Sequence, residues 1–152
     1  MAPSTAIRLI YISQATTPFD DTALIDLAAK AAENNKTVEV TGLLMRVGNY
    51  FLQVLEGPTV NVRKLFAKIA EDPRHTSVRT VYQEDAPERA FGQWSMSYLR
   101  VDDYYNVGTG EFLEIKNAVA DTMGSGQSLK QSVAKAITTL PALLKRYKIN
   151  VS

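Results

Sequence analysis

The fold is decided by the stretch YFLQVLEGP at residues 50–58, where a strand is followed at once by a helix. Tyr50–Glu56 is an apolar run of strand length, and Gly57-Pro58 ends it and opens a helix, because proline is tolerated in the first helical turn. Just upstream, Val47-Gly48-Asn49 is typical of a tight turn, so an antiparallel partner strand is predicted at residues 39–46.

Outward from this hairpin, the pattern predicts the order strand, helix, strand, strand, helix, strand, strand. A first strand at residues 6–13 is apolar on both faces, as in a buried sheet, and a helical apolar pattern follows at 21–33. The second helix ends at Asp72-Pro73, and further strands are predicted at 77–83 and 94–101. This is the α+β, ferredoxin-like β-α-β-β-α-β-β plan, with a five-stranded mixed sheet and two helices on one face.

The remaining chain has a helical pattern. Residues 110–152 predict two short amphipathic helices, in which Pro141 marks a kink or a restart. These helices either cover the open face of the sheet or form a subunit interface. We therefore expect a first unit at residues 1–103 and a C-terminal helical extension at residues 104–152.

The composition excludes several classes of protein. The 152 residues contain no cysteine and one histidine, so disulfides, thiolate nucleophiles and histidine-rich metal sites are excluded. A net charge of +1 argues against a nucleic-acid partner, which would require a basic face. No apolar run reaches the roughly 20 residues that span a bilayer, and no signal-peptide pattern is present. A cytoplasmic protein without membrane contact is expected.

Gln53 and Tyr11 are polar side chains within strands that are otherwise apolar. A buried glutamine amide must satisfy two donors and an acceptor, and leaving them unpaired costs about 1–3 kcal/mol. Backbone groups or water would suffice as partners. If the first and third strands are neighbours, however, the hydroxyl of Tyr11 lies beside Gln53 under the two helices. Trp94 and Met96 alternate on one face of the fifth strand and either complete this pocket or belong to the core.

Two further polar clusters follow the predicted helices. Asn34 and Asn35 end the first helix, where one asparagine suits a C-cap and the second amide is free to match the edge of a heterocycle. Lys68, Arg74 and His75 gather at the end of the second helix. They are either cations placed favourably near a helix C-terminus or a clamp on the anionic tail of a cofactor.

Four blocks of this sequence resemble, in the same order, the BLUF domain, a blue-light sensor that uses FAD. The blocks are RLIYISQ at 8–14, TGLL at 41–44, FLQVLEG at 51–57 and WSM at 94–96. The segment DPRH at 72–75 looks like the one that follows the second helix in that family. The resemblance covers about residues 6–101, and the helical tail is similar to that of short stand-alone members, the PixD-like type.

The resemblance implies that FAD binds non-covalently between the two helices. Tyr11 then matches the redox-active tyrosine, and Gln53 the glutamine between that tyrosine and the flavin. Asn35 matches the asparagine that bonds the carbonyl edge of the ring, with Asn34 as a neighbour that helps to hold the cofactor. The other implied cofactor-binding residues are Lys68, Arg74, His75 and Met96.

The resemblance also implies how the signal is made and transmitted. Light drives electron and proton transfer from Tyr11 through Gln53, which rearranges the hydrogen bonds at the flavin. Trp94 and Met96 then signal to the C-terminal helices. A homo-oligomer and a downstream protein partner are implied, without enzymatic activity and without nucleic acid or membrane as partners.

Three other functions share parts of this pattern. An RNA-recognition module has the same split β-α-β plan but requires exposed aromatic residues on the sheet and a basic surface. An acylphosphatase-like hydrolase requires a phosphate loop or a nucleophile with its base, and neither is visible in the sequence. A light-insensitive regulatory module would lack flavin, which the intact set of Tyr11, Gln53 and Asn35 argues against.

Overall fold

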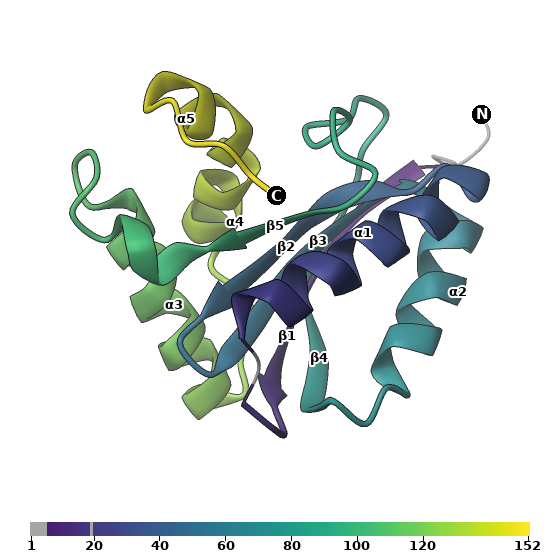
Figure 1. The fold of residues 1–152 in the computed structure, drawn as a ribbon, viewed down its shortest axis with the longest axis horizontal. Coiled ribbons are helices and arrows are strands. Elements are labelled where there is room, and N and C mark those ends of the chain that lie inside the picture. The colour runs from purple at the N-terminus through teal and green to yellow at the C-terminus, as the bar shows by residue number, and fades with distance from the viewer. Residues whose placement is uncertain (1–5, 19) are drawn as a thin grey trace.

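The computed structural model describes residues 6–18 and 20–152, whose elements follow the expected order. Residues 1–5 of the expected first unit and Phe19 lie outside the described residues. The elements are β1 (Ala6–Ala15), α1 (Asp21–Thr37), β2 (Thr41–Val47), β3 (Tyr50–Pro58), α2 (Thr59–Ala70), β4 (His75–Asp85), β5 (Ser97–Arg100), the 3-10 helix η1 (Val101–Tyr104), α3 (Glu111–Ser125), α4 (Gln131–Thr138) and α5 (Leu140–Arg146) (Figure 1).

The strands form one five-stranded mixed sheet in the order β4-β1-β3-β2-β5. β1 pairs antiparallel with β3 and β4, β2 pairs antiparallel with β3, and β5 lies parallel to β2. Gly48 in the turn between β2 and β3 has a φ of 59°, a left-handed conformation that glycine adopts without strain. The predicted ferredoxin-like plan with one added strand is therefore confirmed, including the adjacency of the first and third strands.

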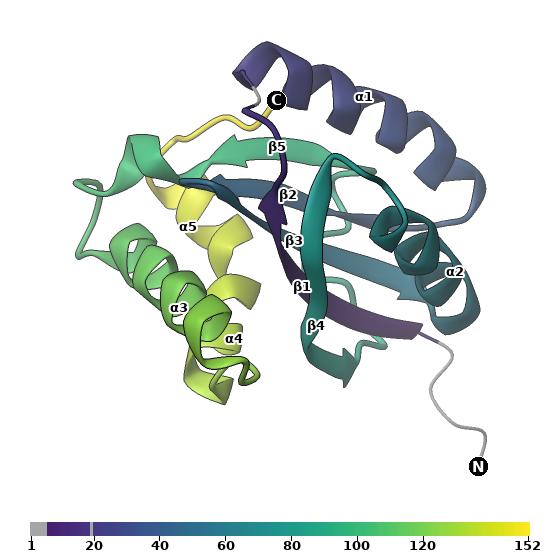
Figure 2. The same ribbon diagram turned by 90° about the horizontal axis from the view of Figure 1, so that it is seen from below.

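Each face of the sheet carries its own hydrophobic core, and helices lie on both sides (Figure 2). Ile7, Leu9 and Tyr11 of β1 point toward α1 and α2, on what we call the α1/α2 face. Ile10 and Ile12 point the other way, to the tail face, where α3, α4 and α5 pack. The strand has two apolar faces because side chains alternate along it and both faces are covered.

The C-terminal segment contains three α-helices, where the sequence predicted two. Leu129, predicted as helical, lies before α4, where its N–H donates to the carbonyl of Val81 at 3.0 Å. Pro141 lies in the first turn of α5 and so begins a new helix, as proline needs no N–H partner there. The tail covers the open face of the sheet, one of the two alternatives that its pattern allowed.

The end of α1 lies further along the chain than predicted. The helix continues to Thr37 and its C-cap is Val38, whose N–H donates to the carbonyl of Asn35 at 3.2 Å. Asn34 and Asn35 therefore lie in the last turns of the helix, and the prediction that one of them is the C-cap was wrong. The left-handed residue comes later, at Glu39, with a φ of 59°.

Candidate functional site

Tyr11 and Gln53 meet at the centre of the α1/α2 face. They are direct partners in the β1–β3 ladder, as the strand order required. The hydroxyl of Tyr11 donates to Oε1 of Gln53, and Nε2 of Gln53 donates to the sulfur of Met96 at 3.1 Å. The exposed fractions are 2% for Tyr11 and 5% each for Gln53 and Met96. The amide is thus hydrogen-bonded at both ends and almost fully buried.

The surroundings of Tyr11 favour the neutral phenol. Its ring lies 5.4 Å from that of Phe66 and 6.2 Å from that of His75, between centroids. Burial, and to a lesser extent the negative charge of Asp72, raises the pKa of Tyr11 well above its usual value of 10.0. The Tyr11 hydroxyl therefore remains a hydrogen-bond donor throughout the physiological pH range.

This pKa shift predicts a loss of stability in alkali. The unfolded chain releases the Tyr11 proton near pH 10.0, while the folded chain retains it, so stability is full below that pH and falls above it. Tyr11→Phe removes this pH-dependent contribution. Between about pH 9 and about pH 11, the free energy of unfolding should therefore fall by about 1.4 kcal/mol less in the variant than in the parent. Urea unfolding at both pH values measures the difference, and equal losses would contradict the shift.

A cavity of about 220 Å³ opens between the sheet and the two helices. Its walls are mainly apolar and include residues of α1, and its lining also includes charged groups from α2 and the segment that follows it. The lining residues are Tyr11, Leu27, Ala28, Ala31, Leu44, Phe51, Gln53, Lys68, Ile69, Asp72, Arg74, His75 and Met96. Six of the predicted cofactor-binding residues are thus brought together, namely Tyr11, Gln53, Lys68, Arg74, His75 and Met96.

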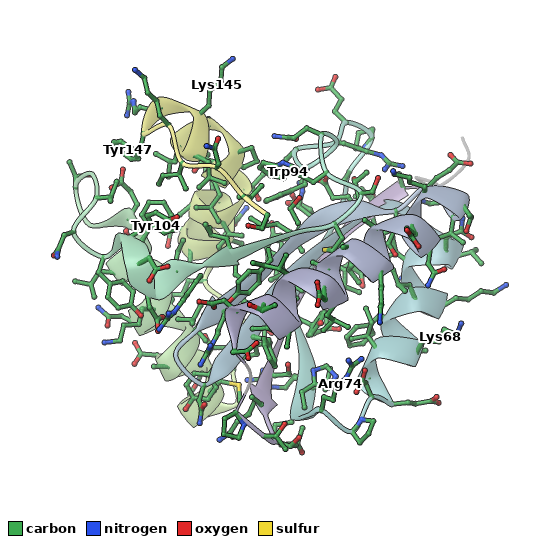
Figure 3. The ribbon with its side chains drawn as sticks, viewed as in Figure 1. Lys68, Arg74, Trp94, Tyr104, Lys145 and Tyr147 are labelled. Atoms are coloured by element: carbon green, nitrogen blue, oxygen red, sulfur yellow. The ribbon has the colours of Figure 1, made fainter. Side chains whose placement is uncertain are left out.

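The charged end of the cavity carries two cations and one carboxylate. Nε of Arg74 donates to the two carboxylate oxygens of Asp72 at 2.9 and 3.0 Å, and this bond lowers the pKa of Asp72 to about 2. Lys68 forms no ion pair with any part of the chain that the structure describes. Figure 3 shows Lys68 on α2 and Arg74 near the segment that follows it. The positive charge of Lys68 is therefore available to an anion.

His75 is held by both of its ring nitrogens. Nε2 lies 2.7 Å from the carbonyl oxygen of Ile69, which only accepts, so Nε2 carries the proton. Nδ1 lies 2.8 Å from the hydroxyl of Ser13, within hydrogen-bond distance. Ser13 was missed by the sequence reasoning, although its place two residues after Tyr11 puts both on the same strand face. His75 offers the cavity the surface of its ring, because both nitrogens are already bonded.

The two asparagines of α1 differ sharply in their surroundings. Asn34 is exposed and does not line the cavity. The side chain of Asn35 is 1% exposed, and its Nδ2 donates to the carbonyl of Ser95 at 2.8 Å. Its Oδ1 is buried and has no hydrogen-bond partner among the described residues. A buried acceptor without a partner is rare in native proteins. Asn35 is not among the residues that line the cavity.

Trp94 and Met96 do not share a face, and that prediction was wrong. β5 begins only at Ser97, and the two residues precede it in an irregular connection. Met96 lies in the core of the α1/α2 face, whereas Trp94 packs on the tail face, its ring 6.3 Å from that of Phe91 (Figure 3). The strict alternation of a strand does not apply where the backbone leaves the ladder, as it does here.

The fold and the site define a class of protein: an α+β domain with a small-molecule site between its sheet and two helices. Phenol, amide and thioether form one hydrogen-bonded row in the lining of that site, which also includes the cations Lys68 and Arg74. No group of His, Asp and Glu side chains suited to a metal ion occurs among residues 6–18 and 20–152. The same residues contain no helix long and apolar enough to cross a membrane.

Comparison with known proteins agrees with this class. The sequence model of the family described as "BLUF: Sensors of blue-light using FAD" matches residues 6–97, which is more than half of the chain. The chain therefore belongs to the BLUF family of blue-light sensors. The expectation drawn from the four sequence blocks is confirmed.

Individual relatives extend this result. The photoactivated adenylate cyclase subunit beta of Euglena longa is 33% identical over 145 residues, which are 95% of this chain and 16% of the relative. This chain thus spans about a sixth of the curated protein it matches. BlrB, a BLUF protein solved in its dark state, has a TM-score of 0.74 at 21% identity, covering 92% of this chain and 97% of that one, and supports the fold. Klebsiella pneumoniae BlrP1, solved with FMN and cyclic diGMP, has a TM-score of 0.62 at 27% identity, covering 80% of this chain and 35% of that one.

Proposed function

We propose that this chain is a blue-light receptor that binds FAD non-covalently in the cavity between the sheet, α1 and α2. The observation that carries the proposal is the buried row from Tyr11 through Gln53 to Met96, which lies on the cavity floor. The unpaired Oδ1 of Asn35 supports it, because the edge of a flavin ring offers an N–H between two carbonyl groups. The apolar walls suit a flat ring system.

When bound, the flavin absorbs blue light and serves as the electron acceptor. Tyr11 would give an electron to the flavin and a proton, through its hydrogen bond, to Oε1 of Gln53, and both would return to Tyr11 as the charge recombines. Gln53 has two amide ends of similar shape and opposite hydrogen-bonding sense. Its rotation would exchange the groups facing Tyr11 and Met96, whereas tautomerisation would leave them in place and turn the oxygen into a donor. The protein itself acts as a sensor and carries out no enzymatic turnover.

One spectrum tests this function. The purified protein should be yellow, and blue light should shift its absorption band slightly to the red, with full recovery in darkness. Chromatography of the released flavin would distinguish FAD from FMN. A colourless preparation that takes up neither flavin on reconstitution would overturn the proposal.

Lys68 and Arg74 are proposed to bind the phosphate-bearing tail of the cofactor, at the open end of the cavity. Lys68→Gln should weaken FAD binding roughly fivefold, because an exposed charge contributes up to about 1 kcal/mol, and added salt should reduce the difference. Riboflavin, which has the ring but no phosphate, should bind both proteins equally well. Titration of the apoprotein with each flavin gives the comparison, and an equal loss of affinity for both flavins would assign Lys68 to the ring.

His75 is proposed to contact the ring, and Asn34 to help to hold the cofactor.

The signal is proposed to leave the site through Met96 and β5. Tyr98 in β5 exchanges two backbone hydrogen bonds with Ser152, at 2.7 and 3.1 Å, so β5 is joined directly to the end of the tail. Trp94 contributes from the tail face, where it packs beneath the helices. We take residues 1–103 as the sensor unit and 104–152 as the output extension, which meets a second copy or a downstream protein partner in the cytoplasm. Hydrogen exchange of residues 104–150 should differ between darkness and light, and identical protection would exclude this route.

A further inference from the structure

A buried ion pair lies on the tail face, and the proposed photochemistry makes no use of it. Arg8 in β1 and Glu56 in β3 are partners in the strand ladder, and their exposed fractions are 6% and 0%. Nε of Arg8 donates to Oε2 of Glu56 at 2.6 Å. Burying two charges is expensive, and the cost is recovered only where further hydrogen bonds satisfy both groups. The remaining partners of this pair therefore indicate what it holds.

Apart from Glu84 in β4, which contacts Nη1 of Arg8, those partners lie in the connection between β4 and β5, residues 86–96. Glu56 accepts from the backbone N–H groups of Ala90 at 2.9 Å and Phe91 at 2.6 Å. Arg8 donates through Nη2 to the carbonyl of Glu88 at 3.3 Å. One carboxylate thus binds three donors, two of which belong to an irregular segment that forms no ladder of its own.

The same connection then crosses to the α1/α2 face and completes the candidate site. Phe91 is fully buried, and its carbonyl accepts from the N–H of Trp94 at 3.3 Å. The N–H of Gly42 in β2 donates to the carbonyl of Trp94 at 2.9 Å. The next two residues are Ser95, whose carbonyl holds Asn35, and Met96, whose sulfur holds Gln53.

Where the connection passes from the tail face to the α1/α2 face, beside Gly42, Met96 has little space to move. A Cβ atom on Gly42 would lie 1.9 Å from the carbonyl oxygen of Val54 and 3.2 Å from the terminal methyl of Met96. The methionine therefore packs directly against the backbone of β2. A displacement of Phe91 on the tail face must be taken up within the four residues that separate it from Met96.

We propose that Glu56 and Arg8 are positioning residues for the Gln53 site, acting across the sheet through residues 90–96. They hold the start of this segment on the tail face, and thereby fix the carbonyl of Ser95 and the sulfur of Met96 against Asn35 and Gln53. The expected effect on the flavin spectrum rests on the proposed function, whereas the expected effect on how firmly residues 90–96 are held does not. The acceptor oxygens of Glu56 are the groups to change.

Glu56→Gln and Glu84→Gln form a matched pair of variants. Glu84 contacts Nη1 of the same Arg8, but its side chain is 34% exposed, and its other partner is the hydroxyl of Tyr82, outside the connection. Both variants remove one negative charge beside Arg8. Ala90 and Phe91 donate to different oxygens of Glu56, so only Glu56→Gln replaces the acceptor of one of these N–H groups with an amide nitrogen, which cannot accept.

Limited trypsin digestion measures how firmly the connection is held. Cleavage after Arg89 should become roughly tenfold faster in Glu56→Gln, relative to cleavage after Lys30 in α1, because the loss of a charge-assisted hydrogen bond favours local opening by about that factor. Glu84→Gln should stay within about twofold of the parent. General destabilisation would accelerate both cleavages together, and that result would overturn the proposal.

The flavin-loaded proteins supply the second readout. Glu56→Gln should shift the dark absorption band and change the rate of dark recovery several-fold, while Glu84→Gln should match the parent. A normal photocycle in a variant that is cleaved faster at Arg89 would show that the pair does not position the site.

If Glu56→Gln fails to fold, Arg8→Lys supplies the test, because a lysine cannot bridge the same three partners. The rate of cleavage after Arg89 should then rise about threefold. A parent protein without flavin would end the proposed function, and the digestion would still decide whether the pair holds the connection.

Discussion

Tyr11→Phe should bind flavin with an unchanged dark colour and show no reversible red shift under blue light. The substitution removes only the hydroxyl that donates to Gln53, and the ring keeps its contacts with Phe66 and His75. The fold should therefore be retained, at a stability cost of about 1 kcal/mol for the lost hydrogen bond. Absorption spectra before and after illumination measure the effect, which is complete loss of the shift.

Tyr105→Phe is the matched control for this prediction. Its hydroxyl donates to Asp102 at 2.7 Å, in the segment after β5 and outside the cavity. This variant should show the photocycle of the parent. If Tyr11→Phe still gave a normal red shift, the electron and proton would have to come from another residue, and the role proposed for Tyr11 would be wrong.

Gln53→Ala should lose the photocycle and also show an altered spectrum in darkness. The substitution removes both ends of the amide at once, so the hydroxyl of Tyr11 and the sulfur of Met96 lose their shared partner. Leaving the buried phenol unpaired costs about 1–3 kcal/mol, so unfolding by urea should also occur at lower denaturant concentration. The dark spectrum separates this variant from Tyr11→Phe, in which the amide remains.

The control for Gln53→Ala is Gln83→Ala, which makes the same change at an exposed position of β4. Its dark spectrum, red shift and stability should equal those of the parent. A Gln53→Ala protein with the parent's dark spectrum would mean that the amide does not contact the flavin. The proposed hydrogen-bond switch would then need a different residue.

The sequence allowed the strand pairing to be predicted because both hairpin strands and β1 carry strong local signals. Val47-Gly48-Asn49 determines how β2 meets β3, and the split β-α-β plan then makes β1 the neighbour of β3. Tyr11 and Gln53 followed from that adjacency and from side-chain alternation alone. The direct register pairing and the hydrogen bond between them are visible only in the structure.

Other features depend on tertiary contacts that no local pattern carries. Trp94 and Met96 were assigned to one face because alternation was extended into a segment where hydrogen bonds from Gly42 and Asn35 hold the backbone instead. The observed end of α1 differs from the predicted one because the helix propensities of the residues give only a weak preference at helix ends. Arg8 and Glu56 were read as ordinary strand residues, since their partnership with a distant connection is visible only once the chain is folded.

The alignment of β1 with β3 has a consequence for how the chain finds its native pairing. Because both faces of these strands are apolar, a slip by two residues would leave every hydrophobic side chain on its proper side. Such a slip would, however, set Tyr11 against Phe51 or Leu55 and separate Arg8 from Glu56. The two polar cross-strand pairs are three residues apart along β1 and lie on opposite faces of the sheet. They thus select one register among several that hydrophobic side chains alone would leave nearly equal in free energy.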